Sequence, residues 1–133
     1  MGIVIDSSVL IAWERNQLDL EALMAHYAEK DFAISAMTAS ELLHGVHRAR
    51  TAARRSRREA FVEALLSRIP VLAFDLITAR VHARLSAGLA AKKTAVGLHD
   101  LIIGATAIAN GYAVAARDER SFCKIPGLSV LHW

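Results

Sequence analysis

Short apolar runs alternate with longer amphipathic segments along this chain, and that alternation constrains the fold more than any other feature. The runs are almost continuously apolar, which is typical of strands buried on both faces of a parallel sheet. Strands are expected at residues 3–5, 32–35, 71–74, 112–115 and 128–131. With helices between them, these strands predict an α/β fold, an α/β/α sandwich around a central, mostly parallel sheet.

The segments between the strands have the spacing of amphipathic helices. Helices are expected at residues 7–14, 18–27, 38–48, 52–69, 76–91 and 98–110. In the fourth, an apolar residue recurs every four positions from Phe61 to Ile69, and in the fifth a similar stripe runs from Ile77 to Leu89. No linker, repeat or low-complexity segment divides the 133 residues, so we expect one domain spanning residues 1–133.

Four acidic residues stand where an apolar strand run ends or a helix begins: Asp6, Glu41, Asp100 and Asp118. In an open parallel sheet, ligands bind beyond the carboxyl ends of the strands, so acids at such junctions can converge although they are far apart in sequence. Like charges in one cleft raise each other's pKa and destabilise the fold unless a metal ion or an arginine compensates. The pattern therefore favours a metal-binding nuclease site.

Each acid also has a purely structural explanation. Asp6 suits the N-cap of the helix that follows it, and Thr38-x-x-Glu41 has the form of a capping box, in which Glu41 reaches back to the helix start. Asp100 and Asp118 suit helix starts, where a carboxylate meets the positive end of the helix dipole. Each acid taken alone favours the cap, whereas the four together favour the site.

The segments that carry these acids resemble those of the PIN domain. The matching pieces are residues 3–11, 38–42 and 99–107, followed by Arg117-Asp118 with Phe122. They occur in the family's order and cover the whole chain. More narrowly, the closing segment from Phe122 to Leu128 resembles the ending of the VapC type of toxin ribonuclease.

This resemblance implies an activity and a set of site residues. It implies an endoribonuclease that uses Mg²⁺, for which Mn²⁺ can substitute, to activate a water molecule. By the same resemblance, the metal ligands are Asp6, Asp100 and Asp118, Glu41 completes the catalytic set, and Ser7 or Ser8 supports Asp6.

Two positions near the last acid depart from the family pattern or leave it open. Many members of the family carry Thr or Ser two residues before that acid, whereas this chain has Ala116, so a hydroxyl contribution is absent there. Glu119 directly follows Asp118, and an exchange of roles between these two acids stays open.

Arginine is concentrated in one short segment, although the net charge of the chain is only +3. The cluster consists of Arg48, Arg50, Arg54, Arg55, Arg57 and Arg58. Such a cluster is typical either of a phosphate-binding surface or of a solvated helix face, and both interpretations remain open. The candidates for RNA contact are Arg50, Arg54, Arg57, Arg58 and Arg117.

Three other functions compete with this hypothesis. His44, His47 and His99 could bind zinc, but the chain has one cysteine and no His-Glu-x-x-His pattern. An aspartate-nucleophile phosphatase also begins with a strand that ends in Asp, but it needs a second acid where Ser8 stands. A catalytically inactive PIN-like module that binds RNA or protein is the main alternative.

The resemblance also implies partners, namely an RNA substrate, a cognate antitoxin that fills the acidic groove, and a second copy in a homodimer. Residues 101–116 are the longest apolar stretch, and they fall short of the roughly 20 residues that span a bilayer. With no signal peptide visible at Met1, we expect a cytoplasmic protein without a membrane segment. The single Cys123 has no disulfide partner and is expected to be a small buried residue.

Overall fold

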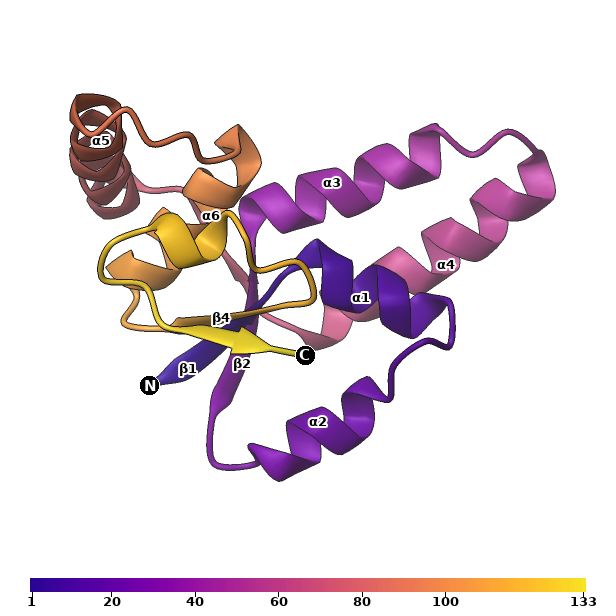
Figure 1. The fold of residues 1–133 in the computed structure, drawn as a ribbon. Helices are drawn as coiled ribbons and strands as arrows, with labels where there is room; N and C mark the ends of the chain where they lie inside the picture. The colour runs from indigo at the N-terminus through magenta and orange to yellow at the C-terminus, as the bar shows by residue number, and fades with distance from the viewer.

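The computed structural model describes residues 1–133, which form one five-stranded sheet with helices around it (Figure 1). The strands are β1 Gly2–Ile5, β2 Asp31–Ser35, β3 Val71–Leu72, β4 Ala113–Ala116 and β5 Val130–His132. Their order across the sheet is β3-β2-β1-β4-β5, and every neighbouring pair is parallel. The predicted α/β fold with a parallel sheet is confirmed.

Six α-helices and one turn of 3-10 helix connect these strands. They are α1 Ser7–Glu14, α2 Leu20–His26, α3 Ala36–His47, α4 Ala52–Arg68, α5 Leu76–Ala91, α6 Leu98–Ala109 and η1 Phe122–Lys124. The bounds of α1 and α5 are as predicted, and the other α-helices differ at their ends by two residues or fewer. None of the helices combines the length and the apolar character needed to cross a membrane.

Two hydrophobic cores lie on opposite faces of the sheet, because successive side chains of a strand point to opposite sides. Ile3 and Ile5 of β1 belong to the core that includes residues of α1, α3 and α4. Val4 lies between them in the strand and belongs to the other core, with residues of α5 and α6. This division confirms the predicted α/β/α sandwich.

The chain reverses its direction across the sheet at β1. From β1 it moves outward through β2 to β3, and it then returns to add β4 and β5 on the other side of β1. The carboxyl ends of β1 and β4 are therefore a topological switch point, where open parallel sheets leave a crevice for ligands. Asp6 directly follows β1, and its backbone N–H donates to the carbonyl of Ala115 in β4 at 2.9 Å.

Helix α3 begins at Ala36, two residues before the expected start, and this corrects the interpretation of Glu41. Ser35 is the N-cap, and its hydroxyl oxygen accepts a 3.0 Å hydrogen bond from the backbone N–H of Thr38. Serine is as good a cap as threonine, so the end of β2 supplies the cap itself. Glu41 consequently lies in the second turn of α3, and the predicted capping box is wrong.

Two expectations about burial are also wrong. The buried stripe of α5 starts at Thr78 rather than at Ile77, and it continues to Leu85 and Leu89, so Ile77 is 63% exposed. Thr78 lies seven positions before Leu85, which is two helical turns, whereas Ile77 lies one position off that line. Cys123 is exposed, because the turn η1 directs its neighbour Phe122 into the core instead.

Candidate metal and nuclease site

Three of the four predicted acids line one hollow at the carboxyl ends of β1 and β4. This acidic hollow is about 370 Å³ in volume and has no hydrophobic lining residue. Its walls are Asp6, Asp100, Asp118, Arg120, Ser121 and Lys124. Glu41 lies next to it, close enough to Asp6 for the two carboxylates to repel each other. The structure thus brings together the four acids that the sequence placed at strand and helix ends.

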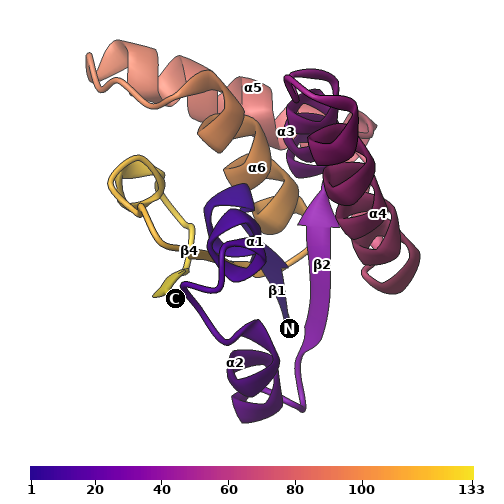
Figure 2. The same cartoon turned by 90° about the vertical axis from the view of Figure 1, so that its right-hand side faces the viewer.

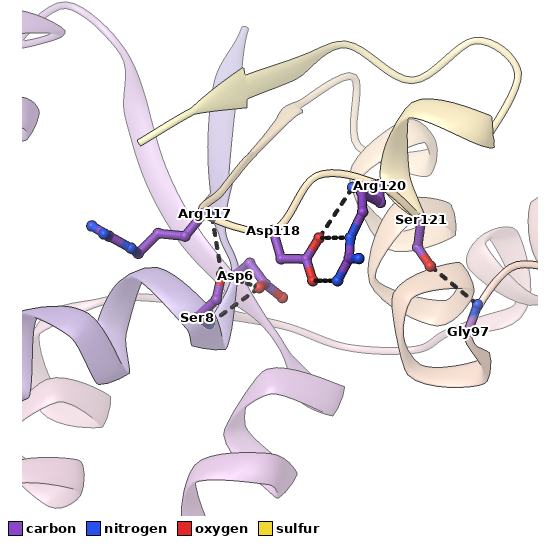
Figure 3. A network of polar contacts seen from close by, with 7 residues as sticks. All are labelled: Asp6, Ser8, Gly97, Arg117, Asp118, Arg120 and Ser121. Atoms are coloured by element: carbon purple, nitrogen blue, oxygen red, sulfur yellow. Dashed lines mark hydrogen bonds and ion pairs between the residues drawn. The ribbon is translucent and has the colours of Figure 1, made fainter.

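The carboxylate of Asp6 is held by Ser8, which is itself hydrogen-bonded to the chain after β4. Its Oδ2 accepts hydrogen bonds from the backbone N–H of Ser8 at 3.1 Å and from the Ser8 hydroxyl at 2.6 Å. The same hydroxyl oxygen accepts a 3.1 Å bond from the backbone N–H of Arg117, which follows β4 (Figure 3). Asp6 is therefore the N-cap of α1 as well as a wall of the acidic hollow. Since only Oδ2 is used for capping, Oδ1 remains available for a ligand.

Glu41 points from α3 toward Asp6 and contacts the first turn of α6. Its Oε2 lies 3.3 Å from Nδ1 of His99, and the Ser7 hydroxyl faces the same carboxylate. Its Oε1 is buried and has no hydrogen-bond partner. Burial raises the pKa of Glu41, and the charge of Asp6 adds to that rise, although the bond with His99 opposes it. A buried carboxylate oxygen without a partner is costly, so this position favours a bound cation.

Asp100 lies in the first turn of α6 and faces Asp6 across the acidic hollow. Burial raises its pKa, and the charges of Asp6 and Asp118 raise it further, while a hydrogen bond from the Ser121 side chain opposes the rise. The same serine oxygen accepts a 3.4 Å bond from the backbone N–H of Gly97 (Figure 3). Ser121 therefore links the start of α6 to the loop after β4.

Asp118 differs from the other acids because an arginine already neutralises it. Arg120 donates two hydrogen bonds to the Asp118 carboxylate, from Nε to Oδ1 at 2.9 Å and from Nη2 to Oδ2 at 2.8 Å (Figure 3). Hydrogen bonds from Arg120 lower the pKa of Asp118 to about 2. Arg120 was not among the residues predicted from sequence, although a cation two residues after the last acid was a visible signal.

The donors fit a hard divalent ion, but they do not form a closed cage. No group of three or more acidic, histidine or cysteine side chains stands in a ligating arrangement. Mg²⁺ does not require such a cage, because it keeps several waters and takes one or two carboxylates together with substrate phosphate oxygens. A volume of about 370 Å³ leaves room for these waters, each of which occupies about 30 Å³. The all-oxygen donor set and the unpartnered Oε1 of Glu41 fit Mg²⁺ or Mn²⁺.

Other predicted candidates lie outside this hollow. The Arg117 side chain points away from Asp118 (Figure 3), and Glu119 contacts Nδ1 of His132 at 3.4 Å, so neither of them lines the hollow. His44 and His47 line a separate surface groove of α3 with Val71. Ala116 is fully buried in β4. The remaining candidate arginines, Arg50, Arg54, Arg57 and Arg58, gather in a second groove at the turn between α3 and α4.

Comparisons with protein families, with known sequences and with solved structures all find PIN-domain or VapC proteins. The family model described as "PIN domain" matches residues 3–128. The chain is 34% identical over 131 residues to "Ribonuclease VapC1" of Rickettsia felis, which covers 98% of this chain and 96% of that protein. It is also 34% identical over 100 residues to "tRNA(fMet)-specific endonuclease VapC" of Salmonella typhimurium, covering 75% and 74%. The crystal structure of DNA-bound VapBC from Salmonella typhimurium matches it with a TM-score of 0.90 and 28% identity, over 100% of this chain and 98% of that one.

Proposed function

This chain belongs to the PIN-domain family and, within it, to the VapC ribonucleases, and on that basis we propose that it is a Mg²⁺-dependent endoribonuclease. It acts as the toxin of a toxin–antitoxin pair in the cytoplasm. The observation that carries the proposal is the meeting of Asp6, Glu41 and Asp100 at the switch point of the sheet, where Glu41 keeps a buried oxygen without a partner.

The metal would be held by Asp6, Asp100 and Asp118, with Glu41 as a further oxygen donor. When bound, it supplies a water of lowered pKa and stabilises the charge that develops on the phosphate oxygens. Ser8 orients the carboxylate of Asp6, and Ser121 orients that of Asp100. These bonds keep the carboxylates directed at the place where the reaction occurs.

Two cationic side chains in the acidic hollow would bind the phosphate of the RNA substrate. Arg120 and Lys124 line it together with the acids, so they offer positive charge to an RNA phosphate that would otherwise be repelled. Arg120 also keeps Asp118 ionised, because its hydrogen bonds lower the pKa of that carboxyl group to about 2. The hollow thus combines groups that bind metal with groups that bind phosphate.

The substitution Asp6→Asn tests the proposal. Asparagine caps a helix as well as aspartate does, so the fold should persist, while Mg²⁺-dependent RNA cleavage should fall by about a thousandfold or more. Asp19→Asn is the matched control, since Asp19 caps α2 by accepting from the N–H of Ala22 at 3.0 Å and is exposed. Cleavage is measured with purified protein, with and without a chelator.

Cleavage that survives in Asp6→Asn would remove the acidic hollow from the mechanism. Absence of Mg²⁺-dependent cleavage from the unmodified protein, together with retained RNA binding, would instead favour the inactive PIN-like module. The Asp19→Asn control should match the unmodified protein in either case.

An antitoxin and a second copy of the chain are the expected protein partners. The solved neighbours named VapBC support the antitoxin. An apolar patch at the start of α5 supports the homodimer, since Phe74, Leu76 and Ile77 are between 44% and 66% exposed. Phe74 also lines a groove with Met37 and Ile102, so residues of α3 and α6 continue the patch. Light scattering on the purified chain tests the dimer, and a monomer at every concentration would contradict it.

A further inference from the structure

The arginine cluster forms a groove at the turn between α3 and α4. Its arginines are Arg48, Arg50, Arg54, Arg57 and Arg58. Glu14 is the single acid that lines this arginine groove, and it pairs with Nη2 of Arg58 at 3.7 Å. The other four arginines have no ion pair. Arg55 is excluded from the groove, because its Nη2 donates to the carbonyl of Ala49 instead.

Arginines at the start of α4 are unfavourable for that helix by itself. The start of α4 contains Arg54 and Arg55 and has no acidic residue in its first turn. A helix N-terminus carries partial positive charge and favours acids, so arginines there are unfavourable for the isolated helix. Local choices that conflict with the fold are expected at functional sites. An anion bound in the arginine groove would relieve both the repulsion among the arginines and their conflict with the helix.

A small hollow of about 60 Å³ lies between the arginine groove and Glu41, and it marks a path along the surface from that groove toward the acidic hollow. This third hollow contains Glu41 at one end and Glu14 and Arg58 at the other, with Gly45 between them. It therefore shares residues with the arginine groove and touches the acid that adjoins the acidic hollow. Helix α1 forms its other wall, packed against α4 through the rings of Trp13 and Phe61, whose centroids are 5.5 Å apart.

The path from the arginine groove toward the acidic hollow runs along the helical hairpin of α3 and α4. Both views show these helices side by side (Figures 1 and 2), and Figure 1 shows their connecting turn projecting away from the sheet. Glu41 and Arg48 are seven residues apart on α3, which corresponds to about 10 Å along the helix. The arginine groove thus lies a few nucleotides of extended chain away from the acids.

We propose that single-stranded RNA lies along this path, with its scissile phosphate at the acidic hollow and its flanking phosphates in the arginine groove. The proposal rests on the nuclease function proposed above and extends it to substrate binding. The guanidinium fork matches phosphate oxygens bidentately, which suits a groove lined by five of them. Only Ala49 and Phe61 are hydrophobic there, whereas a protein partner needs an apolar interface core.

The proposal is tested most directly by comparing a long RNA substrate with a short one. Arg54→Glu with Arg57→Glu should lower kcat/KM at least about tenfold for an RNA of some twenty nucleotides, because two phosphate contacts become repulsive. The same double variant should cleave a dinucleotide as the unmodified protein does, since such a substrate cannot reach the arginine groove. The matched control is Arg80→Glu with Arg84→Glu, an equal change of charge on exposed residues of α5, which lies on the opposite side of the molecule (Figure 1).

Three outcomes would overturn the proposal. Equal losses in both double variants would mean that net charge alone matters, and equal losses on both substrates would mean a structural effect on the acids. Unchanged cleavage of the long RNA, with loss of binding to poly-glutamate, would assign the arginine groove to an acidic protein segment. Arg54→Gln with Arg57→Gln, checked by thermal melting, repeats the test without charge reversal.

Binding measurements separate this proposal from the nuclease function. In an Asp100→Asn background, filter binding of the long RNA should fall at least about tenfold in the arginine variant and stay unchanged in the α5 control. If the unmodified protein cleaves neither substrate, the nuclease function fails, and this binding comparison still decides the path. If both substrates are cleaved but binding does not change, only the path fails.

Discussion

The acidic hollow and the arginine groove carry opposite charge, and the fold holds that charge in different ways. Ser8, in the helical turn that Asp6 caps, holds the Asp6 carboxylate, and Ser121 from the loop after β4 holds that of Asp100. Asp6 is only 6% exposed. In the arginine groove, by contrast, Arg58 alone has an ion pair. Chemistry requires reacting groups to be fixed within a fraction of an ångström, whereas binding a polyanion requires only enough cations nearby. This difference agrees with the proposed division, in which cleavage belongs to the first region and RNA affinity to the second.

Of the three effects that test this comparison, the largest is expected at Glu41, which adjoins the acidic hollow and lines the third hollow. Glu41→Gln should reduce Mg²⁺-dependent cleavage at least about a hundredfold on long and short RNA alike, because the carboxylate charge is lost next to Asp6. Thermal stability should persist, since Glu41 caps no helix. Glu63→Gln, an exposed position on α4, is the control. A Glu41→Gln protein with full activity would contradict this division, because Glu41 would then belong to neither region.

An effect of intermediate size is expected on the salt dependence of RNA binding. Each phosphate contact contributes about −0.7 to the slope of log affinity against log salt for single strands, so replacing Arg54 and Arg57 should flatten that slope by about 1.4. Asp100→Asn should leave the slope unchanged, because an acid releases no counterions from RNA. Titrations of RNA at several salt concentrations measure both variants. A flattened slope in Asp100→Asn would show that the two regions do not act separately.

The smallest expected effect is on stability and depends on pH. Asp100 has a raised pKa in the folded chain, so its carboxylate destabilises the fold only once it ionises there. Below the ordinary value of 3.8 both states are protonated and the penalty is absent, and it appears as pH rises through the raised pKa. Asp100→Asn should therefore slightly raise the melting temperature of the metal-free protein at pH 7.

That gain should disappear below about pH 4, where Asp100 is protonated in the unfolded chain too. Melts without metal at both pH values measure it, and Asp19→Asn again serves as the control. A loss of stability at pH 7 would show that the Asp100 carboxylate stabilises the start of α6, as a structural cap does, rather than crowding its neighbours.

Much of the fold could be predicted from sequence, because buried strands and amphipathic helices are set by local patterns. Helix α1 was placed correctly, since Asp6 both ends an apolar strand and caps the helix after it. The start of α3 was misplaced, because Ser35 and Thr38 are equally good caps and only the end of β2 decides between them. Patterns with two equivalent solutions need the tertiary structure to resolve them.

The positions of the acids could be predicted more readily than their partners. Their place at strand and helix ends is visible along the chain, and the topology of a parallel sheet then brings them to one edge. The Ser8 hydroxyl, however, accepts from a backbone group 109 residues away, and His99 meets Glu41 across 58 residues. Contacts of that separation leave no local pattern. The roles of Asp6, Glu41, Asp100 and Asp118 in catalysis stay a prediction.

The pairing of β1 with β4 also means that the sheet can be completed only after most of these residues have been translated. Residues 2–5 emerge from the ribosome long before Ala113–Ala116, which is their neighbour on one side. Until then β1 has an open edge, and Ser8 lacks the backbone partner that follows β4. A message broken before that point would encode a polypeptide without Asp118 and without the completed sheet. Such a polypeptide would lack one wall of the acidic hollow.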